Sequence, residues 1–113
     1  MIEFILGNRT AERVLLHIYH YGEIHAAGIA GDYGVVVNPI RQQLERFEKG
    51  NILVSKMVGR TRVYLFNPKS PYVKPLKEIL KITYEAIPLN ERESLFSQRR
   101  RPREKGKKVI NGL

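Results

Sequence analysis

The chain has 113 residues, 42% hydrophobic and 27% charged, and its 20 Lys and Arg outnumber its 11 Asp and Glu to give a net charge of +9. A chain of this length builds one small core, which excludes enzymes that enclose a large cleft between domains. It contains no cysteine, which excludes disulfide frameworks, thiol nucleophiles and cysteine-based zinc sites. Its apolar runs are too short to cross a bilayer, and we expect no secretory leader. We therefore expect a cytoplasmic binding module without membrane association.

The first predicted helix begins at Thr10, a suitable N-cap, and ends at Gly22. Apolar residues recur in it at the helical period: Ala11, Val14, Leu15, Ile18 and Tyr19. After an extended step at residues 23–24, the small residues of 25–31 predict a helix of about two turns. Residues 32–34 then form a turn, because the glycine at its end tolerates the positive φ of a tight corner between helices.

The next helix is predicted to start at Asn38 and Pro39, because Asn is a good N-cap and Pro suits the first helical position. It ends near residues 49–50. Apolar residues at i, i+4 and i+7 form a stripe that is predicted to face the core: Ile40, Leu44 and Phe47.

Two β-rich runs follow, residues 52–58 and 62–67, separated by a turn at 59–61 with basic residues at its tip. This pattern predicts a hairpin. Residues 73–84 then form a last helix with a broad apolar face, which ends before Pro88. Together these elements predict a mainly α fold with a small β-hairpin, in the α+β class.

Three motifs carry a resemblance to a known family. Residues 6–10 read Leu-Gly-Asn-Arg-Thr, residues 59–68 read Gly-Arg-Thr-Arg-Val-Tyr-Leu-Phe-Asn-Pro, and residues 40–53 match Ile-Arg-x-x-Leu-x-x-x-x-x-Gly-x-Ile/Leu. With them, residues 5–87 resemble winged helix-turn-helix regulators of the ArsR and MarR type, above all a small prokaryotic group with the wing Gly-Arg-Thr-Arg-x-Tyr-x-x-Asn-Pro. The resemblance implies a three-helix core, a wing and a C-terminal helix. It also implies a sequence-specific transcriptional regulator, a homodimeric repressor bound to double-stranded DNA in the nucleoid.

The helix predicted to start at Pro39 is the second helix of this helix-turn-helix. When its apolar stripe is buried, a rotation of about 100° per residue places its polar residues on the outer side. The outer face and its flanks carry Asn38, Arg41, Gln42, Glu45, Gln43 and Arg46. Arg pairs with guanine, and Gln or Asn with adenine, in the major groove. The N-terminal half of such a helix meets the bases. We therefore predict Arg41 and Gln42 as base readers and Asn38, Gln43 and Arg46 as further DNA contacts. The alternative is a solvated helix surface.

The tip of the hairpin is predicted to contact the adjacent DNA backbone or minor groove. Arg60, Thr61 and Arg62 supply two guanidinium groups and a hydroxyl there, and Lys56 adds charge. The alternative is a charged turn that only protects a sheet edge from pairing.

Residues 1–88 are thus the predicted winged-helix domain, and residues 89–113 a basic, flexible tail. Residues 99–113 hold seven basic residues and one acid, so the tail fits a polyanion partner. Around its proline, three arginines either lie along a minor groove or contact phosphates non-specifically: Arg100, Arg101 and Arg103. The alternatives are a solubilising tail and weak contact with anionic lipid.

The last helix carries more apolar surface than a small core needs. We predict that it forms the homodimer interface through Val73, Leu76, Leu80 and Tyr84. The alternative is that this face packs within the same chain. The apolar residues 2–6 either join the interface or cap the core.

Other chemistry is not indicated. His17, His20 and His25 have a spacing that permits metal ligation, but they lack a convincing carboxylate partner set, so we expect no metal and no cofactor. Neither a phosphate-binding glycine loop nor a nucleophile with its base is recognisable, and we expect no enzyme activity. The alternative function is a winged-helix scaffold that binds another protein, such as a separately encoded nucleotidyltransferase.

Overall fold

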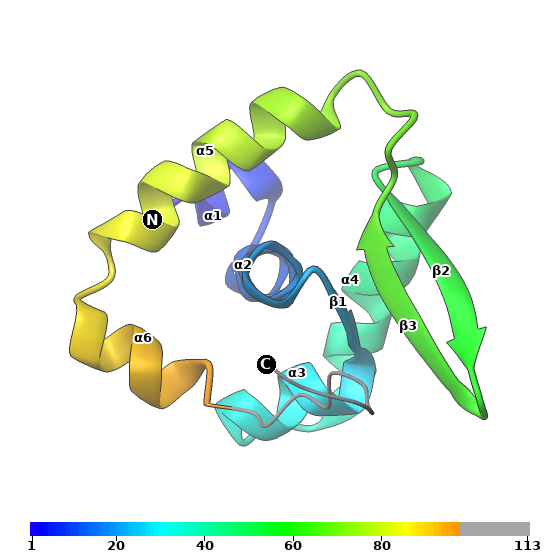
Figure 1. Ribbon diagram of the computed structural model, residues 1–113, viewed down its shortest axis with the longest axis horizontal. Helices are drawn as coiled ribbons and strands as arrows, with labels where there is room; N and C mark the ends of the chain where they lie inside the picture. Colours follow the sequence, from blue (N-terminus) through cyan, green and yellow to red (C-terminus); the bar gives the residue numbers. More distant parts are fainter. Residues whose placement is uncertain (98–113) are drawn as a thin grey trace, which may run out of the picture.

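The computed structural model describes residues 1–97, in which helices surround one central helix (Figure 1). The helices are α1 (Glu3–Leu6), α2 (Arg9–Tyr21), α3 (Ala26–Tyr33), α4 (Val37–Lys49), α5 (Val73–Ala86) and α6 (Leu89–Leu95). The strands are β1 (Glu23–His25), β2 (Leu53–Val58) and β3 (Thr61–Phe66). Figure 1 shows α2 end-on, with α5, α6, α3 and α4 around it and the hairpin projecting to one side. The α+β prediction is confirmed.

The central helix α2 begins two residues earlier than a Thr10 cap would allow. Asn8, with extended backbone, accepts a hydrogen bond from the Ala11 amide through its side-chain oxygen at 2.7 Å, so Asn8 is the N-cap and the prediction of Thr10 is wrong. Gly22 ends the helix with φ 85°, as expected. Apolar residues of α2 are fully buried and form the centre of the core: Ala11, Val14, Leu15 and Ile18.

The helix-turn-helix is formed by α3 and α4. Gly34 takes φ 65° at the corner, as predicted, whereas residues 32–33 belong to α3 and not to the turn. Val36 occupies the N-cap position of α4 with φ −69° and ψ 153°. Asn38 therefore lies inside the first turn, and its prediction as the cap is wrong, because the chain enters helical geometry two residues before the expected start.

The hairpin is confirmed and is part of a sheet with order β1-β3-β2. Strands β2 and β3 pair antiparallel around a turn at Gly59 and Arg60, with Val58 opposite Thr61. The extended step predicted at residues 23–24 is β1, which pairs antiparallel with β3 and aligns Ile24 with Tyr64. The wing is thereby fixed to the helical core at its base.

The apolar face of α5 packs on the core of the same chain. Val73 and Leu80 are buried, and Leu76 and Tyr84 pack partly buried against the same cluster, with α5 lying on α2. These are the four residues that the sequence assigned to a dimer interface. In the single chain, Val73 and Leu80 pack within the chain, which is the alternative that the sequence left open, whereas Leu76 and Tyr84 stay partly exposed.

The first residues of the predicted flexible tail, 89–96, belong to the folded domain. Residues 89–95 form α6, and Phe96 is buried in the core. The Phe96 ring stacks on His20 with centroids 4.4 Å apart and lies 4.8 Å from the ring of His17. The expected boundary at residue 88 is therefore eight residues too early. The predicted contacts of Arg100, Arg101 and Arg103 lie outside the described residues.

The two histidines of this cluster are held by hydrogen bonds between helices. The His17 ring is fully buried, with Nε2 2.8 Å from the carboxylate of Asp32 on α3 and Nδ1 3.2 Å from the carbonyl of Arg13. His20 Nδ1 lies 2.8 Å from the hydroxyl of Tyr84 on α5. These polar contacts join α2 to α3 and α5 at the point where Phe96 closes the core.

We expect this cluster to make the fold sensitive to acid. Burial lowers the pKa of His20 below its ordinary value of 6.5, and the nearby His17 lowers it further. The unfolded chain then binds protons at a higher pH than the folded protein does, so the free energy of unfolding falls as the pH drops below about 6.5. His20→Phe keeps a ring against Phe96 and removes one titrating group, so urea unfolding between about pH 7 and pH 5 should show a shallower decline. An unchanged slope in this variant contradicts the assignment.

Candidate nucleic-acid interface

The outer face of α4 is exposed along the length of the helix. Ile40, Leu44 and Phe47 are buried, as the sequence predicted. The residues that point away from them are exposed: Asn38, Arg41, Gln42 and Glu45. A guanidinium, two amides and a carboxylate on one open helix face can all form hydrogen bonds with base edges in a major groove.

Arg41 is oriented by a neighbour on its own helix. Its Nη1 donates to Oδ1 of Asn38 at 2.9 Å, one turn toward the N-terminus. This bond fixes one edge of the guanidinium and limits the rotamers of a long side chain. An arginine oriented in this way loses less entropy when its other N–H groups bind a partner.

Arg46, which the sequence predicted as a DNA contact, is exposed and also has partners within the fold. Its Nη2 donates to the carbonyl of Leu6 at 2.9 Å, and its Nε donates to Oε1 of Gln43 at 2.9 Å. The guanidinium also stacks 4.6 Å from the ring centroid of Phe47. These contacts join α4 to the end of α1, and the predicted DNA contacts of Arg46 and Gln43 stay predictions.

A groove of about 350 Å³ separates α4 from the wing. It is lined by His25, Ala26, Ala27, Arg41, Glu45, Arg60, Thr61, Arg62 and Tyr64. Four of the predicted contacts, Arg41 and residues 60–62, therefore share one concavity although they lie about twenty residues apart in the chain. Three guanidinium groups against a single carboxylate give this groove the charge of an anion-binding site.

A chain of hydrogen bonds ties the wing to α4. Arg62 Nη1 donates to Oγ of Ser55 at 3.0 Å, and the Ser55 hydroxyl donates to Oε2 of Glu48 at 2.6 Å. Sequence reasoning missed Ser55 and Glu48. The available signal was strand alternation, since Ser55 and Met57 share a face of β2 and Arg62 pairs with Met57.

The remaining predicted contacts on the wing are exposed. Lys56 Nζ lies 3.0 Å from Oε1 of Glu23 on β1, an exposed ion pair that is readily exchanged for another anion. Arg60 and Thr61 are exposed at the hairpin tip. Burial raises the pKa of Tyr64 at the base of the groove, so its hydroxyl stays protonated near neutral pH.

Residues 1–97 contain neither a membrane-spanning helix nor a cluster of metal-ligating side chains. No helix there is both long enough and apolar enough to span a bilayer. In the same part of the chain, no three His, Cys, Asp or Glu side chains are grouped so that they could hold a metal ion.

The arrangement of α2, α3 and α4, followed by the β2–β3 hairpin, defines a winged helix-turn-helix fold. No protein-family model matches the chain, and no curated protein matches it. Among solved structures it is similar to the crystal structure of the AntR antimony-specific transcriptional repressor, with a TM-score of 0.53 and 23% sequence identity over 75% of this chain and 77% of that chain. This likeness confirms the fold that the wing and helix motifs indicated.

Proposed function

We propose that the protein is a sequence-specific DNA-binding transcriptional regulator, and more specifically a homodimeric repressor. In this proposal α4 enters the major groove and the β2–β3 wing contacts the adjacent backbone or minor groove. The observation that carries it is the groove in which Arg41, Arg60 and Arg62 converge beside an exposed polar helix face. The net charge of +9 and the likeness to a transcriptional repressor support it.

The proposed contacts divide into two kinds. Arg41 and Gln42 read base edges, with Asn38 orienting Arg41. The wing neutralises phosphates through Lys56, Arg60 and Arg62, with Thr61 as a hydroxyl donor. We propose phosphate contact for the tail arginines Arg100, Arg101 and Arg103 as well.

The proposed homodimer uses a different apolar surface from the one first expected. Phe4 on α1 is 91% exposed and Ile82 on α5 is 70% exposed, and Ile5 and Ile79 are exposed beside them in sequence. Both helices pack on α2, and in Figure 1 α1 lies behind α5. Exposed apolar side chains on two helices that pack on the same central helix fit a second copy of the chain related by a two-fold axis.

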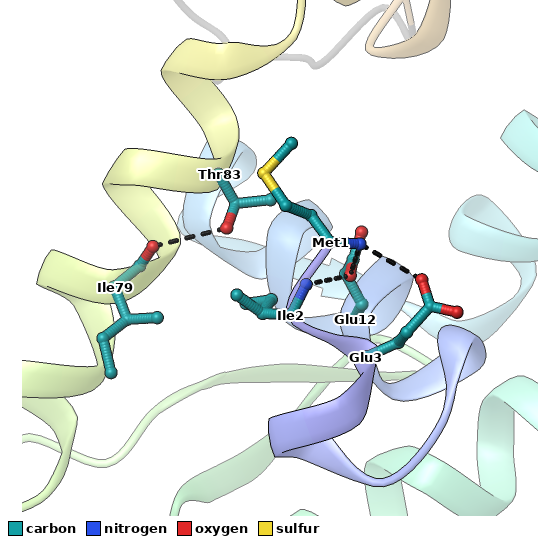
Figure 2. Close-up of polar contacts among 6 residues, drawn as sticks. All are labelled: Met1, Ile2, Glu3, Glu12, Ile79 and Thr83. Atoms are coloured by element: carbon teal, nitrogen blue, oxygen red, sulfur yellow. Dashed lines mark hydrogen bonds and ion pairs between the residues drawn. The ribbon is translucent and has the colours of Figure 1, made fainter.

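The N-terminus holds α1 in place for such a contact. Figure 2 shows the terminal amino group of Met1 between the carboxylates of Glu12, at 2.9 Å, and Glu3, at 3.1 Å. The Ile2 amide donates to the same Glu12 oxygen at 2.8 Å, and the Ile2 side chain is buried in the core cluster. A fixed α1 presents Phe4 without first having to be ordered.

The test is selection of bound fragments from a random duplex pool, followed by fluorescence anisotropy at several salt concentrations. We expect one enriched sequence and an affinity that falls linearly on a log-log plot against salt. In Arg60→Ala/Arg62→Ala the affinity should fall for every sequence, and the slope should decrease in magnitude by about two. Lack of enrichment and of duplex affinity, together with a stoichiometric co-purifying protein, contradicts the proposal and favours a protein-binding scaffold.

A further inference from the structure

Val36 presents an exposed apolar side chain at the N-terminal end of α4. It is 73% exposed, whereas the next residue, Val37, packs against the core, and the preceding Val35 is 42% exposed. Two residues further on, Asn38 begins the exposed polar face that continues to Arg41. Val36 therefore lies at the N-terminal end of α4, which is the end that would enter a major groove first.

The same position makes valine a costly choice for helix stability. Val36 is the N-cap of α4 and has the extended backbone in which Ser, Thr, Asn or Asp accepts a hydrogen bond from the first turn. Valine has no side-chain atom that can do this. Asn8, at the corresponding position of α2, does so at 2.7 Å. A site that departs from a local stability rule while exposing an apolar group is where a functional contact is expected.

We propose that Val36 recognises the 5-methyl group of a thymine in the major groove, next to the bases read by Arg41 and Gln42. This inference rests on the proposed DNA-binding function. The N-terminal residues of a recognition helix are the ones that meet base edges. Thymine is the base that offers an apolar group there, and small apolar side chains are its partners. The proposed dimer surface lies on α1 and α5, so Val36 is left to a different ligand.

The test combines variants of the full chain with single-atom-group changes in the selected duplex. Each thymine is replaced in turn by uracil, which removes only the 5-methyl group. For the wild type we expect one replacement in each half-site to weaken binding about fourfold, as the loss of one buried methyl predicts. Val36→Ser should bind the thymine duplex about fourfold more weakly and show no further loss with uracil at that position. Its response to uracil elsewhere should match the wild type.

Stability measurements separate lost contact from lost folding. Serine at position 36 supplies the missing cap, so we expect Val36→Ser to raise the thermal unfolding midpoint by a few degrees while it weakens binding. Val36→Ala removes the methyl groups without adding a cap and should lose the thymine response without gaining stability. Val35→Ala is the matched control in the same turn and should keep the thymine response.

Three results overturn the inference. The first is a Val36→Ser protein whose affinity still falls at every position where uracil weakens wild-type binding, and the second is a selected site in which no replacement of thymine by uracil weakens wild-type binding. The third is a change in the oligomeric mass of Val36→Ser in solution, which would place Val36 at an interface between copies. If any of these appears while Arg41 still determines the selected sequence, only the thymine contact is wrong. If the random pool yields no enriched sequence at all, the proposed function fails with it.

Discussion

Replacement of Arg41 by alanine is expected to remove most of the discrimination between the selected duplex and unrelated DNA. A bidentate pair between arginine and guanine contributes about 1 to 3 kcal/mol to discrimination, which is about 5- to 150-fold in affinity for each half-site. Arg41 is exposed and is oriented by Asn38, so its removal leaves the core of α4 intact. Anisotropy with the selected duplex and a scrambled one measures the ratio of the two affinities.

Arg41→Lys is the matched control for charge. Lysine keeps the positive charge but lacks the planar fork that bridges the two guanine acceptors. We expect Arg41→Lys to bind scrambled DNA as the wild type does and to lose much of the preference for the selected duplex. If Arg41→Ala weakens binding to both duplexes by the same factor, Arg41 contacts phosphate and is not a base reader.

Leu80→Ala is expected to lower the free energy of unfolding by about 2 to 5 kcal/mol. Leu80 is 0% exposed and belongs to the core cluster, on the helix α5 that packs on the central helix α2. The truncation leaves a cavity in a domain whose total stability is of the order of 5 to 15 kcal/mol. Urea unfolding followed by circular dichroism, at fixed protein concentration, measures the change.

Ile82 is exposed on the same helix, and its substitution is expected to change dimerisation and not stability. Ile82→Asp places a charge on the proposed dimer surface, 70% exposed in the single chain, so it should shift sedimentation toward the monomer and leave the secondary structure unchanged. The assignment of Leu80 to the core and Ile82 to the dimer surface is contradicted by two results together. These are a Leu80→Ala protein that keeps its stability but becomes monomeric, and an Ile82→Asp protein that stays dimeric.

The elements with a strong apolar period were predictable. The stripes of α2 and α4 and the paired runs of the hairpin lie where the sequence indicated, because local spacing determines which side is buried. α6 was missed, since residues 89–95 contain only two apolar residues and depend on the burial of Phe96 in a distant cluster. β1 has three residues and acquires its strand character from pairing with β3, about forty residues later.

The candidate site was predicted in part for the same reason. Helical rotation correctly placed Arg41 and Gln42 on the exposed side of α4. Rotation alone does not reveal which partner a flanking residue meets, and Arg46 finds the Leu6 carbonyl forty residues away. Likewise, an apolar face on α5 predicts burial, but whether α2 or a second copy covers Leu80 depends on tertiary packing.

The bond from Arg46 to Leu6 links two parts of the molecule that the proposed function uses for different purposes. Gly7, with φ 110°, turns the chain there, and a Cβ at this residue would lie 3.6 Å from Arg46 Nη2. In the proposed dimer, α1 meets the second copy, and Arg46 makes each α4 follow its own α1. The distance between the two α4 helices of the dimer then depends on the position of α1. A ligand or substitution that displaces α1 would therefore change the spacing between DNA half-sites that the dimer can bind.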